Sequence, residues 1–230
     1  MKKQIYDYRG LRPSTLGEPR FRHVRLVLIG WIFYFSFYFI TENLIPAESC
    51  HAMHCALDDV IPFCEYFAVF YVGWYLLVFG SLLYTFLYDV ERFTALQSFI
   101  MITQFVAMFC YIFFPSRQDL RPIVFPRDNF LTHLMQFIYA FDTNTGVCPS
   151  LHVAYSMGIL SVGMKNKELP TVCKVLLTFF VIMICLATAF VKQHSMLDVF
   201  AALPVALLAE AIVYGRSYWL PKFSGSAPRC

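Results

Sequence analysis

The chain has 230 residues, of which 59% are hydrophobic and only 14% are charged, and its formal net charge is +3. A soluble domain usually has roughly a quarter of its residues charged, so this composition is typical of an integral membrane protein. The small net charge and the lack of a basic run with interleaved aromatic residues argue against nucleic acid as a partner.

Six apolar segments follow one another along the chain and predict membrane-spanning helices. The first begins after Arg25 and stays apolar as far as Pro46, and the fourth is shorter than the others. Pro170 is a start signal for the fifth segment. A shorter amphipathic segment at 129–140 predicts an interfacial helix just before the fourth span. The predicted spans are residues 26–40, 66–88, 94–114, 149–164, 171–191 and 199–220.

The predicted fold is an all-α integral membrane protein, a six-transmembrane helix bundle with a short interfacial helix before the fourth span. The chain divides into an N-terminal arm (1–25), a six-span membrane domain (26–220) and a C-terminal tail (221–230). The 25-residue charged leader is long for a cleaved signal peptide, and "AES" at 47–49 is a weak cleavage site, so the first span is expected to remain in the protein.

Lysine and arginine are distributed unequally between the two predicted sides of the membrane. Of the 18 such residues, 14 lie on the side of the termini and four on the other. The positive-inside rule therefore predicts cytoplasmic termini and an opposite face toward the periplasm, the extracellular space or an organelle lumen. The short chain favours a bacterial inner membrane. The four outward cations are Arg117, Arg121, Arg127 and Lys192.

Three polar groups far apart in the sequence fall on this outward side. They follow the third span, open the fourth and connect the fifth to the sixth, so packed helices can bring them together. Arginine offers phosphate oxygens a planar fork, and Ser150 lies at a predicted helix N-terminus, where free N–H groups favour an anion. The predicted phosphate-binding residues are Arg117, Arg121, Ser150 and Lys192.

The same groups contain two histidines and an aspartate. His194 and Asp198 are four residues apart, so the carboxylate can accept a hydrogen bond from one ring nitrogen of His194. The other ring nitrogen is then available as a nucleophile. His152 is the second histidine and is able to protonate a leaving alkoxide. The predicted catalytic residues are therefore His194, His152 and Asp198.

With these motifs, "RQDLRP" (117–122), "PSLH" (149–152) and "KQHSMLD" (192–198), the sequence resembles the type 2 phosphatidic acid phosphatase superfamily. The resemblance covers residues 94–215, the last four spans. It implies a lipid phosphate substrate at the outer membrane face. It also implies that His194 forms a phosphohistidine held by Asp198, that His152 protonates the leaving group, and that no metal or other cofactor takes part.

Two basic positions depart from the family pattern. The lysine seven residues before Arg-Pro is Phe114 here, and the Ser-Arg pair of the third motif is Ala187-Thr188, so Arg117 and Lys192 are the nearest basic substitutes. The motifs look closer to the branch that includes inositol phosphorylceramide synthases and their bacterial relatives. Because that branch contains phosphotransferases, the phosphoryl acceptor, water or an alcohol, stays open.

The expected function is therefore a membrane lipid phosphatase, with a lipid phosphotransferase as the first alternative. A catalytically inactive binding protein or a transporter is the alternative of another class. The spans contain little charge and no inverted repeat, which disfavours a transporter. The expected partners are a lipid phosphate and membrane lipids, and the sequence gives no oligomeric state.

The remaining polar residues of note are expected to have structural roles. "CHAMHC" at 50–55 has ligand-type side chains too closely spaced for one tetrahedral metal site, and disulfides among the outward cysteines stay open. Asp58 and Asp59 are expected in a solvated loop. Glu210 lies inside the sixth span, where a carboxylate needs a partner, so a helix-pair or interfacial role is expected. The outward cysteines are Cys50, Cys55, Cys64 and Cys148.

Overall fold

The structure is a computed structural model that describes residues 5–225, without the side chain of residue 42. In this range the chain is an all-α, multi-pass membrane protein whose strands are limited to two residues each. Five helical segments are long and apolar enough to cross a membrane. They are Pro19–Thr41, Glu65–Tyr88, Val90–Phe113, Thr171–Phe190 and Met196–Phe223.

Every predicted span coincides with an observed helix. The fourth, α6, has only 15 residues and is about 22 Å long, which is shorter than a hydrocarbon core of about 30 Å. It is therefore not among the five segments of spanning length. The six helices are α1 (Arg22–Leu44), α3 (Ala68–Tyr88), α4 (Val90–Phe113), α6 (Leu151–Lys165), α7 (Thr171–Phe190) and α8 (Met196–Tyr214).

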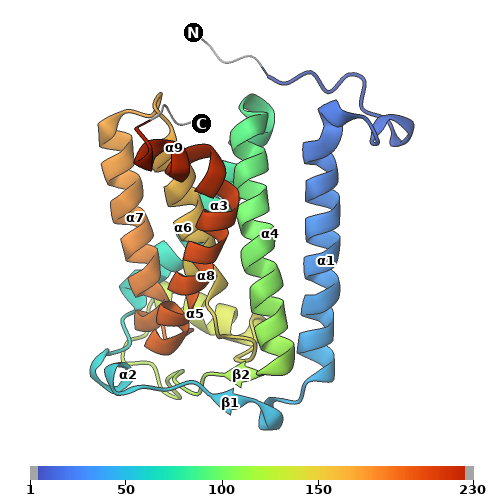
Figure 1. Ribbon diagram of the computed structural model, residues 1–230. Helices are drawn as coiled ribbons and strands as arrows, with labels where there is room; N and C mark the ends of the chain where they lie inside the picture. The colour runs from blue at the N-terminus through green and yellow to red at the C-terminus, as the bar shows by residue number, and fades with distance from the viewer. Residues whose placement is uncertain (1–4, 226–230) are drawn as a thin grey trace.

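The shorter elements gather at the two ends of the bundle (Figure 1). At one end lie α2 (Ala56–Val60), β1 (His51–Ala52), β2 (Ser116–Arg117) and α5 (Phe130–Phe141), and β1 pairs with β2 in parallel. The helix expected at 129–140 is α5. At the opposite end α8 continues through a π-helix, Gly215–Trp219, into α9 (Leu220–Phe223). Single 3₁₀ turns lie at Pro13–Thr15, Pro19–Phe21, Ala47–Ser49 and Glu65–Phe67.

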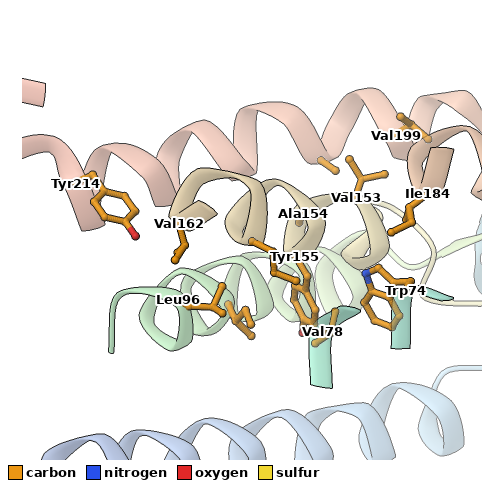
Figure 2. Close-up of a cluster of buried hydrophobic side chains, with 13 residues drawn as sticks. Trp74, Val78, Leu96, Val153, Ala154, Tyr155, Val162, Ile184, Val199 and Tyr214 are labelled. Atoms are coloured by element: carbon orange, nitrogen blue, oxygen red, sulfur yellow. The ribbon is translucent and has the colours of Figure 1, made fainter. Parts of the chain in front are cut away.

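Helix α6 is the centre of the bundle, because it packs against α3, α4, α7 and α8. Figure 2 shows its side chains Val153, Ala154 and Tyr155 in the largest cluster of buried apolar residues. Gly158 allows α6 to approach α4 closely, since a Cβ there would lie 2.6 Å from Cδ1 of Phe99. Because α6 is short and enclosed on several sides, the residues that follow the second motif are largely apolar and uncharged as far as Met164.

Helix α1 lies at the edge of the bundle and packs against α4 (Figure 1). Gly30 is at this contact, where a Cβ would lie 2.9 Å from Nε2 of Gln97. Many apolar side chains of α1 are exposed on the surface, among them Ile29, Ile32 and Phe39, as expected for a helix that faces lipid. The edge position of α1 leaves space between it and α3, and side chains of both helices line a cavity there.

The carboxylate inside the sixth span has the helix-pair role that the sequence predicts. Oε1 of Glu210 accepts hydrogen bonds from Nζ of Lys165 at 2.5 Å and from Nε1 of Trp219 at 2.6 Å. Ser161 Oγ donates to Oε2 at 2.6 Å. The Lys165 ammonium also lies 4.1 Å from the ring centroid of Tyr214. This fully paired cluster joins α6 to α8 at the end of the bundle that carries α9.

Candidate active site

The turn between α7 and α8 presents the third motif. After α7 ends at Phe190, Lys192 adopts a left-handed conformation (φ 54°), which reverses the chain. The amides of Gln193 and His194 both donate to the carbonyl oxygen of Thr188 at 3.0 Å. Ser195 is the N-cap of α8, and its Oγ accepts from the Leu197 amide at 3.2 Å. These bonds give His194 a fixed position at the helix entrance.

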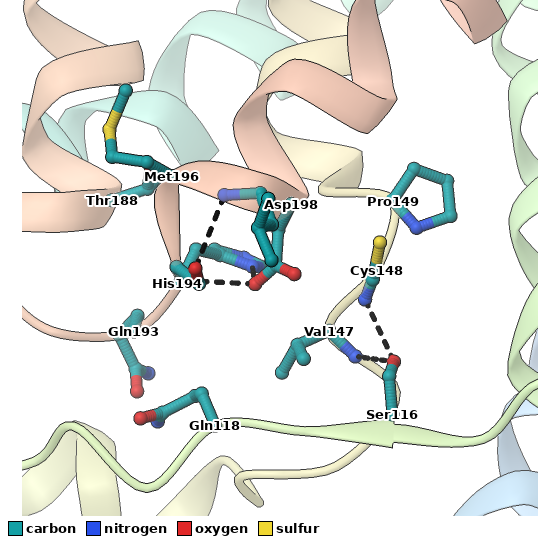
Figure 3. Close-up of polar contacts among 12 residues, drawn as sticks. Ser116, Gln118, Val147, Cys148, Pro149, Thr188, Gln193, His194, Met196 and Asp198 are labelled. Carbon is teal, nitrogen blue, oxygen red and sulfur yellow. Dashed lines mark hydrogen bonds and ion pairs between the residues drawn. The ribbon is translucent and has the colours of Figure 1, made fainter. Parts of the chain in front are cut away.

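His194 and Asp198 form the predicted pair. Nδ1 of His194 lies 3.3 Å from Oδ2 of Asp198, and the same carboxylate oxygen accepts from the Ser195 amide at 3.0 Å (Figure 3). Asp198 is fully buried and His194 is largely buried. With Nδ1 engaged by the carboxylate, Nε2 is the nitrogen of His194 that can meet a substrate.

The second motif is held against the third. The Ser150 amide donates to the carbonyl oxygen of Asp198 at 3.1 Å, and the Tyr111 hydroxyl donates to the carbonyl oxygen of Pro149 at 2.7 Å. As a result the ring centroids of His152 and His194 lie 5.6 Å apart. The two histidines, separated by 41 intervening residues in the sequence, thus face each other as predicted.

Ser116 fixes the loop that precedes the second motif. Its Oγ accepts from the amides of Val147 at 3.3 Å and Cys148 at 3.0 Å (Figure 3). The Cys148 side chain lies near Asp198, and burial together with that carboxylate raises the pKa of the Cys148 thiol to about 12. Cys148 is therefore a neutral thiol at physiological pH, and it packs beside Asp198 without adding charge.

Three buried polar atoms at these motifs have no hydrogen-bond partner among the described residues. They are Oγ of Ser150, Nε2 of His152 and Oδ1 of Asp198. Ser150 occupies the N-cap position of α6 but its side chain makes no capping hydrogen bond. Because buried polar groups are nearly always paired, such a cluster indicates a place where a bound polar molecule completes the hydrogen bonding.

The structure does not bring Arg117 to this cluster. Its Nε donates to Asp119 at 3.0 Å, and its Nη1 donates to the carbonyl oxygens of Ala47 and Cys50, both at 2.9 Å. The side chain thereby attaches β2 to the loop after α1. The donors of Arg117 are therefore directed to the Asp119 carboxylate and to backbone carbonyls, and none reaches the two histidines.

Lys192 is likewise directed away from the histidines. Its Nζ donates to the carbonyl oxygens of Asp58 at 2.8 Å and Ile61 at 2.5 Å, at the C-terminal end of α2. Burial lowers the pKa of Lys192, although Asp58 and Asp59 partly restore it. A cation at a helix C-terminus is favourable because the last carbonyls carry partial negative charge. Lys192 therefore anchors the first outward loop.

Arg121 lies beside the third motif. Its Nε donates to Oε1 of Gln193 at 2.9 Å, and its Nη1 and Nη2 donate to the carbonyl oxygens of Tyr139 and Thr143 at 3.0 and 2.7 Å. Gln193 in turn donates from Nε2 to Oδ2 of Asp142 at 3.1 Å. Arg121 thus reaches the site through Gln193. Sequence reasoning missed Gln193 and Asp142. Gln193 lies within the third motif, next to His194, and Asp142 lies seven residues before the second motif.

The expectation that Asp58 lies in a solvated loop is wrong. Asp58 is buried, and its Oδ1 accepts from the Met196 amide at 2.8 Å. Its Oδ2 accepts from Ser195 Oγ at 2.5 Å and from the Cys55 amide at 2.8 Å. The first N–H groups of α8 have no partner within the helix, so they attract this carboxylate from a distant loop. Asp59, by contrast, is exposed as expected.

The histidines and cysteines of "CHAMHC" have separate surroundings. His54 pairs with Asp59 at 2.8 Å, and the ring of His51 stacks on that of Phe114 with centroids 4.5 Å apart. Cys50 Sγ donates to the carbonyl oxygen of Pro46 at 3.6 Å. Free thiols occur at the other outward cysteines, which are Cys55, Cys64 and Cys148.

A cavity of about 390 Å³ connects the two histidines to the space between α1 and α3. His152, His194 and Asp142 lie at its polar end. The rest of the lining is rich in aromatic side chains, and no lysine or arginine is among the described residues that form it. From α1 and α3 the lining includes Trp31, Tyr34, Tyr38, Trp74, Tyr75 and Phe79.

No family model, curated protein or solved structure matches this chain. The chemistry of the cavity therefore carries the functional inference. At its polar end lie His194, oriented by Asp198, and His152, whose Nε2 has no hydrogen-bond partner among the described residues. The two rings are close enough to reach the same small molecule. Such a set can perform nucleophilic attack by one imidazole and proton transfer by the other.

Proposed function

We propose that this chain is a membrane phosphatase that hydrolyses a lipid phosphate or diphosphate monoester, with a mechanism like that of the type 2 phosphatidic acid phosphatase superfamily. One observation carries the proposal. The His194–Asp198 pair faces His152 at the polar end of a cavity whose other end is aromatic and borders the lipid-facing helices.

In the first half of the reaction, Nε2 of His194 attacks the phosphorus atom and the bond from phosphorus to the ester oxygen breaks. Asp198, bonded at Nδ1, stabilises the positive charge that the ring acquires, as an aspartate does for a catalytic histidine. His152 donates a proton to the departing oxygen, so that the lipid leaves as a neutral alcohol. The products are a phosphohistidine and the dephosphorylated lipid.

In the second half, a hydroxyl oxygen attacks the phosphohistidine. The nitrogen–phosphorus bond breaks, its electron pair returns to Nε2 of His194, and His152 accepts the proton of the nucleophile. With water as nucleophile the product is inorganic phosphate. The second candidate reaction is transfer of the phosphoryl group to an alcohol, as in inositol phosphorylceramide synthase. Asp142 bears on this candidate because it lines the cavity and can accept a hydrogen bond from a hydroxyl group.

Phosphate binding in this proposal depends on neutral donors more than on the predicted cations. Ser150 Oγ is buried and has no partner in the described part of the chain, and the first N–H groups of α6 follow it directly. A helix N-terminus favours an anion, and hydrogen bonds to a charged ligand are strong in a buried site. Arg121 adds positive potential from behind Gln193, whereas Arg117 and Lys192 stabilise the surrounding loops.

The lining of the cavity supports a lipid substrate. Tyr75 and Phe79 on α3 border the cavity, and their side chains are exposed by about half or more. Tyr38 on α1 also borders the cavity and is exposed to a smaller extent. On a membrane-spanning helix such residues face lipid, so an acyl or isoprenoid chain can lie along them while its phosphate reaches His194. The polar end of the cavity then lies near the membrane surface.

We further propose that all six predicted helices cross the membrane, with both termini in the cytoplasm and the histidines facing outward. The enclosure of α6 by four other helices supports this for the short fourth helix, because its ends meet protein rather than hydrocarbon. The distribution of lysine and arginine supports the orientation. A bacterial inner membrane remains the expected location.

The decisive experiment compares wild-type protein with His194→Ala and a matched control, His133→Ala. His133 lies on α5, is exposed and pairs only with Asp128 among the described residues. Purified proteins in detergent are incubated with a panel of lipid phosphates and diphosphates, and free phosphate and new phospholipid are followed together. We expect His194→Ala to reduce turnover by about 10³-fold or more and His133→Ala to leave it unchanged.

Absence of phosphate release and of new phospholipid in the wild type, across the whole panel, would overturn the enzymatic proposal and favour a binding protein or transporter. Equal activity of wild type and His194→Ala would overturn the phosphohistidine mechanism. His152→Ala is the second test, with an expected loss of about 10²- to 10⁴-fold, because general acid catalysis contributes that much.

A further inference from the structure

Asp142 is a carboxylate in the polar end of the cavity that none of the predicted motifs contains. It lies directly after α5 and lines the same cavity as His152 and His194. Burial raises the pKa of Asp142, while His194, Arg121 and Tyr71 act in the opposite direction. A carboxylate is a poor ligand for phosphate, since both groups are anionic, but it is a strong acceptor for hydroxyl groups. Asp142 therefore calls for a role other than phosphate binding.

The orientation of Asp142 is set by a short chain of hydrogen bonds. Arg121 has only donors, so the amide oxygen of Gln193 must face it, and the amide nitrogen of Gln193 then faces Asp142. The bond from Gln193 uses one of about four lone-pair positions of the carboxylate. The remaining acceptor capacity is available to a molecule in the cavity.

We infer that Asp142 binds the nucleophile of the second half-reaction by accepting a hydrogen bond from a hydroxyl hydrogen that is not transferred. This inference rests on the proposed function. For water, that hydrogen is the second one on the attacking oxygen. For an alcohol, it must belong to a neighbouring hydroxyl group, so a polyhydroxy alcohol fits the site better than an alcohol with one hydroxyl.

The atoms balance as in the proposed mechanism. The attacking oxygen forms its bond to phosphorus, its proton goes to Nε2 of His152, and the electron pair of the broken nitrogen–phosphorus bond returns to His194. Asp142 stays ionised throughout and orients the nucleophile. Arg121 orients Gln193, and Gln193 positions Asp142. The arginine of the first motif therefore acts on the cavity without touching it.

The test is a single-turnover experiment with ³²P-labelled phosphatidic acid, or with whichever lipid phosphate of the panel the wild type hydrolyses. Formation and decay of the acid-labile phosphoenzyme are followed by rapid quench in water, with added glycerol, and with added propan-1-ol. The variants are Asp142→Asn, the control Asp128→Asn and the blank His194→Ala. Asp128 is an exposed aspartate outside the cavity, so its variant matches the chemical change.

We expect Asp142→Asn to form the phosphoenzyme at close to the wild-type rate and to lose it at least 10-fold more slowly in water, because a charge-assisted hydrogen bond is lost. Wild type should transfer phosphate to glycerol in preference to propan-1-ol, and Asp142→Asn should lose that preference. Asp128→Asn should match the wild type in every measurement.

Three results would overturn the role of Asp142. They are an unchanged decay rate, an unchanged preference between the two alcohols, and a phosphoenzyme that Asp142→Asn fails to form. The last would place Asp142 in the first half-reaction or in folding. A wild type that turns over no lipid phosphate, or does so without a phosphoenzyme, is a different failure, because it removes the proposed function itself.

Discussion

Single charged side chains attach the loop after α1 to the turn between α7 and α8. Asp58 accepts hydrogen bonds from Ser195 and Met196 at the start of α8, while its own carbonyl oxygen accepts from Lys192. The loop and the turn are separated by more than 130 residues in sequence. The position of His194 consequently depends on a carboxylate that does not line the cavity.

Asp58→Ala is therefore expected to destabilise the protein by about 1–3 kcal/mol at neutral pH, because it leaves buried N–H groups unpaired. Burial raises the pKa of Asp58, but the hydrogen bonds from Ser195, Met196 and Cys55 outweigh it and hold the pKa below its usual value. The stabilisation is then present above the unfolded pKa of about 3.9 and is lost as the pH falls through the lower folded value.

Thermal unfolding in detergent checks this, since the difference between wild type and Asp58→Ala should shrink below about pH 4. Asp59→Ala is the matched control. The Asp59 carboxylate is exposed and pairs with His54, so its loss should change stability by less than about 0.5 kcal/mol. Equal destabilisation by the two variants, or a difference that stays constant with pH, would contradict the role given to Asp58.

At the residue scale, the sequence predicts local pairs better than distant ones. The spacing of four residues was sufficient to predict the contact of His194 with Asp198, because it corresponds to one helical turn. The contacts of Arg117 and Lys192 with the loop after α1 could not be predicted, because the acceptors in that loop are backbone carbonyls. Backbone acceptors carry no signature in the sequence.

At the scale of helices, the apolar segments of the sequence predict well where the helices lie along the chain. They predict poorly which helices pack against each other. All six predicted spans match helices, since backbone groups in lipid must be paired within the helix. The central place of α6 and the edge place of α1 depend on close contacts between particular side chains. Gly158 and Phe99 make one such contact, and a lone glycine in an apolar run does not reveal its neighbour.

Gly158→Ala tests this contact. A Cβ at Gly158 would lie 2.6 Å from Cδ1 of Phe99, so the Phe99 ring or the two helices must shift, and we expect a loss of stability of about 1–3 kcal/mol. Gly80→Ala on α3 is the control, because no described atom lies within 4 Å of a Cβ there. Unfolding in detergent by circular dichroism measures both. A Gly158→Ala protein as stable as Gly80→Ala would show that the helices are less closely packed.

At the scale of the whole molecule, two polar clusters lie at opposite ends of the helix bundle. The site, with α2 and α5, lies at one end, and α9 and the start of α1 lie at the other (Figure 1). The cluster of Lys165 and Glu210 belongs to the α9 end, and the two histidines belong to the α5 end. This polarity fits a protein whose substrate approaches from one face of the membrane.

Epitope tags test the proposed orientation. Tags at the N- and C-termini should bind antibody only after cells or spheroplasts are permeabilised. A tag inserted after Val124, in the exposed loop between β2 and α5, should bind it without permeabilisation. The reverse pattern would contradict the orientation inferred from the lysine and arginine distribution, and termini on opposite sides would show an odd number of spans.

The edge position of α1 has a spectroscopic consequence. Trp31 and Trp74 both line the cavity, one from α1 and one from α3, whereas Trp219, the last of the three tryptophans in the chain, contacts Glu210 at the other end of the bundle. Two thirds of the indole fluorophores therefore border the place where a lipid chain would lie. The intrinsic tryptophan fluorescence of the unmodified protein therefore reports whether a lipid chain occupies the cavity. A brominated lipid, which quenches indole fluorescence on contact, makes that occupancy measurable.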